Sequence, residues 1–196
     1  MTRTLTFADV ARYPRPGVAG PKQFQFAPDG QTINYLHSAD RSLTQGLWAY
    51  DIATGQRTTL TGDRPAPADA RPLTREEELR RERGRIRDLG VTSYQYAAHA
   101  TPPVLLVPEG GALVVRRGDA PLTVLAGSEG AQSACLSPDG SQVAFVRDGE
   151  LCVLDTAGGT ARVLTTGAED GITNGLAEFV AQEEMGRHEG YWWSPD

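Results

Sequence analysis

The chain has 196 residues, among them 22 Gly and 13 Pro, and a formal net charge of −6. Gly and Pro interrupt helices, and their combined share exceeds the roughly 12% of average proteins, so the composition favours short strands joined by turns over a helical bundle. The acidic balance disfavours nucleic acid or an anionic membrane as the main partner, because both need a basic surface. With apolar runs far shorter than the ~18 residues of a membrane span, and an N-terminus without the apolar stretch of a signal peptide, we expect a cytoplasmic protein with no membrane partner.

A turn sequence recurs along the chain. It reads FAPDG at 26–30, LSPDG at 136–140 and WSPD at 193–196. Pro sets φ at the second position of such a turn, Asp binds the backbone ahead of it, and Gly takes the position with positive φ. These turns therefore mark the starts of repeated structural units.

Strands follow the first two turns in the same order, and a middle unit without such a turn fits between them. The first unit has strands at 32–36, 47–52 and 57–60, a middle unit at 93–96, 104–107, 112–115 and 122–125, and a third unit at 142–146, 151–155 and 161–164. Each unit is a four-stranded meander of about 35 to 40 residues, which is typical of a propeller blade. We expect an all-β fold, a partial β-propeller of about three blades plus the start of another, with two short helical insertions. A β-sandwich is the alternative, but it would not repeat this order.

The first helical insertion is predicted at about 74–87, within a segment that interrupts the strands from 62 to 89. Thr74 and Glu77 form a capping box, and arginines follow toward the helix end, as the helix dipole favours. Six arginines lie within 13 residues, which makes this the anion-seeking element of an acidic chain. The alternative is a solvated charged helix that buries only Leu79 and Ile86.

The second insertion, at about 176–189, is predicted to contain a short helix that ends near Gly186. Glu183 and Glu184 are adjacent there. Neighbouring residues on a helix diverge by only about 100°, whereas on a strand they point to opposite faces. Both carboxylates could then bind one ammonium group through charge-assisted hydrogen bonds. A solvated acidic edge is the alternative.

The other reactive side chains give little sign of catalysis or metal binding. Cys135 and Cys152 lie in apolar stretches, so we expect buried, reduced thiols. Since nothing clusters at ligand spacing, no metal and no organic cofactor are expected. Ser128 lies in AGSEG, which departs from the G-x-S-x-G elbow and falls in a turn between units, so it is not expected to be a nucleophile. We expect His188 to be a structural hydrogen-bonding residue rather than a base.

Two segments resemble a known family. The run AEFVAQEEMGRHEGYWWSP at 177–195 resembles the substrate-recognition segment of the dipeptidyl peptidase IV family of serine peptidases, nearest to the branch of dipeptidyl peptidases 8 and 9 and many bacterial enzymes. The run REEELRRER at 75–83, followed by GVTSY at 90–94, is similar to an arginine-bearing helix of that branch. The resemblance is strong from about residue 73 to 196. In that family an eight-bladed propeller caps an α/β-hydrolase domain, and the enzyme removes dipeptides with Pro or Ala in second place from free N-termini.

The resemblance implies roles for three residues. Glu183 and Glu184 match the double-Glu motif that binds the α-ammonium group of the substrate. Arg81 best matches the helix arginine that contacts the substrate backbone, with Arg80 or Arg83 as the alternatives in a shifted register. Carboxylates that hold the ammonium place the scissile bond two residues away, so an acetylated or extended N-terminus is rejected.

The Ser, Asp and His of the family's catalytic triad have no match in this chain. The resemblance therefore implies that residues 1–196 are the N-terminal recognition part of a longer serine peptidase, cut within its propeller and inactive alone. Its expected partners are peptides with a free N-terminus, a C-terminal α/β-hydrolase domain and a second copy in a homodimer. The alternatives are a non-catalytic propeller module that binds peptide N-termini or other proteins, and a relative that has lost its peptidase activity.

Overall fold

The computed structural model describes residues 4–11, 20–62, 78, 81–82, 87–169 and 171–195. The chain forms two compact units, each described here by itself. Unit 1 comprises residues 1–64 and 87–93, and unit 2 comprises residues 65–86 and 94–196.

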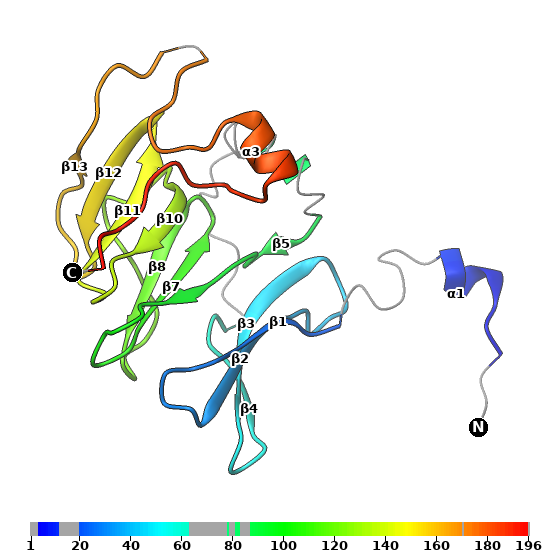
Figure 1. The fold of residues 1–196 in the computed structure, drawn as a ribbon. Coiled ribbons are helices and arrows are strands. Elements are labelled where there is room, and N and C mark those ends of the chain that lie inside the picture. The colour runs from blue at the N-terminus through cyan, green and yellow to red at the C-terminus, as the bar shows by residue number, and fades with distance from the viewer. Residues whose placement is uncertain are drawn as a thin grey trace. The chain divides into compact units, whose positions relative to one another are not determined.

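Unit 1 contains one sheet, which we call the first sheet (Figure 1). Its strands β1 to β4 form an antiparallel meander in chain order, and β5 pairs in parallel with the start of β3. A five-residue helix precedes the sheet. The elements are α1 (Phe7–Ala11), β1 (Lys22–Phe26), β2 (Thr32–His37), β3 (Thr44–Asp51), β4 (Arg57–Thr59) and β5 (Leu89–Gly90).

Unit 2 contains two further antiparallel meanders, the second sheet (β6 to β9) and the third sheet (β10 to β13), and the helix α3. All three sheets follow the predicted strand order, which confirms the all-β fold class and the partial propeller of four-stranded blades. The elements are β6 (Gln95–Tyr96), β7 (Val104–Glu109), β8 (Ala112–Arg117), β9 (Thr123–Val124), β10 (Gln132–Leu136), β11 (Gln142–Arg147), β12 (Glu150–Asp155), β13 (Arg162–Val163) and α3 (Phe179–Glu184).

The core of unit 2 joins the second and third sheets. Strands β7 and β8 contribute alternate aliphatic residues, as expected where successive side chains of a strand point to opposite faces. The third sheet contributes one aromatic ring and several aliphatic side chains, so the two sheets share a single apolar cluster. Its largest members are Val104, Leu106, Leu113, Val115, Leu125, Leu136, Val143, Phe145 and Leu154.

The Pro-Asp-Gly turn between β10 and β11 has the geometry that its sequence predicts. Asp139 Oδ1 accepts hydrogen bonds from Ser137 Oγ at 2.6 Å and from the Ser141 amide at 3.0 Å. The Ser137 hydroxyl and the Ser141 groups hold the pKa of Asp139 well below its ordinary value of 3.8, at about 2. Gly140 has φ +70°, and a Cβ there would lie 2.9 Å from Val104 Cγ2, so the turn requires glycine both for its backbone and for its packing.

The helices follow their capping sequences. At α1, which the sequence analysis did not predict, Thr6 Oγ1 accepts from the Asp9 amide while Asp9 Oδ2 accepts from the Thr6 amide. The predicted helix at 74–87 lies mostly outside the described residues, but Glu78, Arg81 and Glu82 are described and are helical.

The chain is expected to reach the start of another blade at its end, and residues 191–195 carry no strand in the structure. This segment runs beside the third sheet (Figure 1) and is held by side chains instead of a backbone ladder. Tyr191 Oη donates toward Ala144 O at 2.9 Å, and Trp193 Nε1 donates to Cys135 O at 3.0 Å. The segment is therefore placed on β10 and β11 by hydrogen bonds that do not extend the sheet.

Candidate functional site

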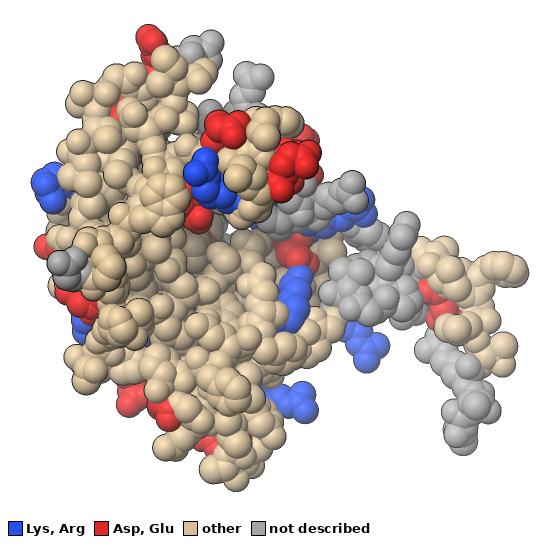
Figure 2. Space-filling model, viewed as in Figure 1, with Lys and Arg blue, Asp and Glu red and all other residues tan. Residues whose placement is uncertain are grey.

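The paired glutamates lie at the C-terminal end of α3. Glu183 and Glu184 are the last two residues of this six-residue helix, and both are exposed. Figure 2 shows acidic side chains gathered on the surface over α3. The structure thus confirms the predicted helical turn and puts both carboxylates in reach of a ligand from solvent, with side-chain directions about 100° apart.

Both ends of α3 are capped. The Glu178 carboxylate accepts from the Val180 amide at 2.7 Å and the Ala181 amide at 2.8 Å, which are unpaired donors in the first turn of any helix. At the other end Gly186 has φ +61°, and the Arg187 amide donates to Ala181 O at 3.0 Å. Gly186 therefore ends the helix, as predicted.

The segment that carries α3 is a closed loop, residues 175–190, which we call the glutamate loop. Its two ends pair through an antiparallel bridge between Leu176 and Glu189 and through the Gly190 amide, which donates to Gly175 O at 2.8 Å. The two backbones approach so closely that a Cβ on Gly190 would lie 2.9 Å from Leu176 O. We call the paired ends, residues 175–177 and 188–190, the neck of the loop. The loop is thus closed at its neck by backbone pairing.

The surface of the loop is apolar as well as acidic, which the sequence analysis did not predict. Only Ala181 of α3 is buried, while Phe179 is 56%, Val180 53% and Met185 71% exposed. The Arg187 guanidinium carbon lies 5.9 Å from the centre of the ring of Trp192, which comes just after the loop, within cation–π range.

Arg81 is helical and half-buried, and it belongs to the same unit as the glutamates. The alternatives Arg80 and Arg83 lie outside the described residues. The structure brings Glu183 and Glu184 together on one turn. It does not fix Arg81 relative to them, because most of 63–86 is outside the described residues.

Ser128 is a structural residue. It is fully buried, its hydroxyl donates to Leu125 O at 2.6 Å, and it accepts from the Leu113 amide at 2.9 Å. A hydroxyl held in this way closes the turn after β9 and is not accessible to a substrate, which agrees with the prediction from its sequence context.

His188 differs in detail from its prediction. Its backbone carbonyl accepts from the Ala177 amide at 3.1 Å at the neck of the loop, whereas its buried Nδ1 has no hydrogen-bond partner among the described residues. The structural hydrogen bond at this position is therefore made by the backbone, which any residue could supply.

Neither cysteine forms a disulfide. Cys152 is buried and Cys135 half-buried, and burial raises the pKa of both thiols. Within the described part of the chain, no group of three or more His, Cys, Asp or Glu side chains is arranged to hold a metal ion. The described helices include none long and apolar enough to cross a membrane.

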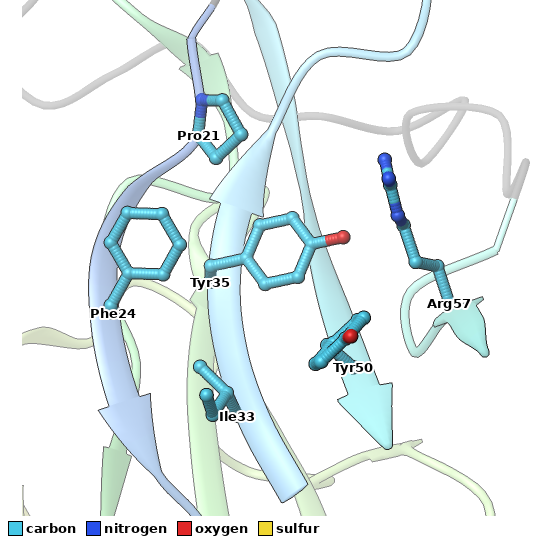
Figure 3. A pocket seen from close by; sticks show the side chains of 6 residues that line it. All are labelled: Pro21, Phe24, Ile33, Tyr35, Tyr50 and Arg57. Carbon is cyan, nitrogen blue, oxygen red and sulfur yellow. The ribbon is translucent and has the colours of Figure 1, made fainter. Parts of the chain in front are cut away.

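A hollow of about 290 Å³ lies on one face of the first sheet (Figure 3). The Phe24 and Tyr35 rings stack there with their centres 5.7 Å apart, and Tyr50 and Arg57 lie on the other side of Tyr35. Tyr35 lies opposite Trp48 in the first sheet, just as Phe145 lies opposite Cys152 in the third sheet, so the two residues mark equivalent faces of their sheets. In the third sheet this face packs on the second sheet. The hollow therefore has the character of a blade-packing face rather than of a ligand site.

Residues 114–196, which include the third sheet and the glutamate loop, match the sequence model described as the dipeptidyl peptidase IV N-terminal region. The paired glutamates, on their capped helix in the closed loop, thus lie in the part of the chain that is similar to this region.

Two curated relatives carry the name dipeptidyl peptidase 8. The human protein is 30% identical over 149 residues, which cover 66% of this chain and 16% of the relative, and the mouse protein is 28% identical over the same shares. The chain thus spans 16% of the length of these relatives. The crystal structure of TolB from Acinetobacter baumannii matches over 75% of this chain and 33% of that chain, with 17% identity and a TM-score of 0.41, a likeness too low to bear on the fold.

Proposed function

We propose that residues 1–196 are the substrate-recognition part of a longer serine-type dipeptidyl peptidase of the dipeptidyl peptidase 8 and 9 branch. This enzyme releases X-Pro or X-Ala dipeptides from free N-termini, and a C-terminal α/β-hydrolase domain supplies its Ser, Asp and His. The observation that carries the proposal is the pair of exposed carboxylates on α3, inside the part of the chain that matches the family. Cytoplasmic location and homodimeric assembly stay predictions.

Glu183 and Glu184 bind the α-ammonium group of the peptide. An ammonium has three donors and each carboxylate accepts through two oxygens, so two carboxylates can satisfy the group with charge-assisted hydrogen bonds. Because the glutamate loop is closed, the ammonium is held at a fixed point, and the scissile bond follows two residues later. Arg81 is the proposed contact to the substrate backbone, since a guanidinium presents planar donors that fit a carbonyl group.

The test uses the full-length enzyme and a chromogenic Gly-Pro substrate. Glu183→Gln and Glu184→Gln keep the side-chain size and remove the charge. Each is expected to lower kcat/KM by about 10- to 100-fold, because a hydrogen bond to a charged group contributes about 1.5–3 kcal/mol. Glu129→Gln is the matched control, since it removes an exposed carboxylate of the same unit outside the loop.

Two results would contradict the proposal: wild-type kcat/KM in both glutamate variants, or equal cleavage of the free and the N-acetylated substrate. Binding of a free-amine X-Pro peptide without any cleavage by the full-length protein would favour the non-catalytic module.

A further inference from the structure

The glutamate loop is fastened to the third sheet on both sides of its neck. On the entering side the Asn174 amide donates to Gly149 O at 2.7 Å, and Asn174 Nδ2 donates to Glu150 Oε2 at 2.9 Å. Both acceptors belong to the hairpin between β11 and β12. Gly175 follows at once, and a Cβ there would lie 2.9 Å from Val146 Cγ2, so the chain enters the loop pressed against β11.

On the leaving side the fastening is made by two aromatic side chains. The Tyr191 hydroxyl contacts Ser133 O and also lies 2.9 Å from Ala144 O, and the Trp193 indole donates to Cys135 O at 3.0 Å. These acceptors lie on β10 and β11. The first residue after the neck is therefore tied to backbone atoms far away in the sequence.

An irregularity of β10 makes this contact possible. The register between β10 and β11 shifts between Gln132 and Cys135, and Ser133 within the shift has φ +47°. A bulge of this kind disrupts the ladder locally and leaves a residue outside its regular pairing. The Ser133 carbonyl is thus available to a side chain, and the Tyr191 hydroxyl occupies it.

The Tyr191 hydroxyl is suited to a permanent donor role. Burial of the side chain raises the pKa of Tyr191 above its ordinary value of 10.0, so the hydroxyl keeps its proton over the whole physiological range. Its single proton is shared between the two carbonyls. A phenylalanine at this position would have no donor for either carbonyl.

We propose that Tyr191 and Trp193 are positioning residues for the paired glutamates. They fix the leaving end of the glutamate loop on β10 and β11, and through the bridged neck they set where Glu183 and Glu184 meet the substrate ammonium. This inference rests on the proposed function of the glutamates. It adds that affinity for the free N-terminus depends on a hydroxyl that does not touch the substrate.

The test measures KM and kcat separately in the full-length enzyme with the Gly-Pro substrate. Tyr191→Phe is expected to raise KM about 3- to 10-fold, the equivalent of one lost hydrogen bond, with kcat within about twofold of wild type. Trp193→Phe removes only the indole donor and is the second variant if Tyr191→Phe does not fold. Tyr50→Phe in the first sheet is the matched control, and it should leave both constants unchanged.

A second readout separates positioning from a general loss of stability. Amide hydrogen exchange of Ala177 and Gly190, the two donors at the neck, should become faster in Tyr191→Phe, while exchange of β11 amides stays as in wild type. In a background that carries both Glu183→Gln and Glu184→Gln, Tyr191→Phe should no longer raise KM, because both carboxylates that it positions are gone.

The outcomes distinguish the two proposals. If the glutamate variants lose affinity and Tyr191→Phe keeps wild-type KM and neck exchange, the positioning role is overturned and the proposed function stands. A KM increase that persists unchanged in the background with both Glu183→Gln and Glu184→Gln also overturns it. If both glutamate variants keep wild-type KM, the proposed function itself fails.

Discussion

Tyr35 and Phe145 occupy the same register position in two different sheets. Each is the fourth residue of a six-residue strand, Tyr35 opposite Trp48 and Phe145 opposite Cys152. Phe145 is fully buried in the cluster between the second and third sheets. Tyr35 is also buried, at 6% exposed, but it lines the hollow of the first sheet and stacks with an exposed Phe24. The same position thus packs against a neighbouring sheet in one repeat and against a ring of its own sheet in the other.

This difference predicts unequal costs for two aromatic truncations. Phe145→Ala removes a fully buried ring and should lower the free energy of unfolding by about 3–5 kcal/mol. Phe24→Ala removes a ring that is 65% exposed and stacked on Tyr35, so its cost should stay near 1 kcal/mol. Urea unfolding followed by circular dichroism measures both. Equal destabilisation would show that the burial seen at Phe145 does not carry the stability of the core.

The Pro-Asp-Gly turn predicts an acid-sensitive contribution to stability. Because hydrogen bonds from Ser137 and Ser141 lower the pKa of Asp139 from 3.8 to about 2, its stabilising effect is fully present well above pH 3.8 and is lost as the pH falls through about 2. Asp139→Ala should therefore be less stable than wild type at about pH 6, and this difference should shrink as the pH falls through about 2. Asp139→Asn keeps an acceptor oxygen without the charge and serves as the control, with a pH-independent effect. A difference between Asp139→Ala and wild type that stays the same from about pH 6 to below about pH 2 would contradict this assignment.

We expect Ser128→Ala to lower the free energy of unfolding without changing peptidase activity. Ser128→Ala leaves the Leu113 amide without its partner in a fully buried position, which should cost about 1–3 kcal/mol. Activity per folded molecule of the proposed full-length peptidase should not change, because the hydroxyl is inaccessible to substrate. Thermal melts and active-site titration measure the two quantities. Abolished cleavage in a folded variant would make Ser128 catalytic after all.

The cap of α3 predicts a local effect on the glutamate loop. Glu178→Ala removes the acceptor of the Val180 and Ala181 amides and should weaken the first turn by about 1 kcal/mol. Hydrogen exchange at these two amides should rise about fivefold, while Glu178→Gln, which keeps one acceptor oxygen, should show a smaller rise. Unchanged exchange in Glu178→Ala would mean that the carboxylate does not cap the helix in solution.

The blades could be predicted from the sequence because their information is local. The Ala-Pro-Asp-Gly and Ser-Pro-Asp-Gly turns fix chain reversals through hydrogen bonds within five residues, and alternating apolar residues follow each of them. The helical turn of Glu183 and Glu184 was predictable for the same reason, since Gly186 sets its end within two residues.

Long-range contacts were not predictable in this way. The pairing of β5 with β3 joins Leu89 to Thr44 through two-residue stretches with no pattern of their own. The closed neck of the loop and the contact of Tyr191 with the bulge in β10 likewise depend on backbone groups whose availability appears only after the sheet has formed. The capping residues Thr6 and Asp9 of α1 are visible in the sequence. The helix has only five residues, so its sequence is hard to distinguish from that of a polar turn.

The two native thiols have a practical consequence. Only the thiolate reacts with maleimides, and burial keeps Cys135 and Cys152 protonated at neutral pH. A cysteine introduced at Met185, which is 71% exposed, should therefore be labelled first without removal of either native cysteine. A fluorophore attached there would sit one residue from Glu184, so a change in its emission on addition of a free-amine peptide would test the proposed binding of a peptide N-terminus.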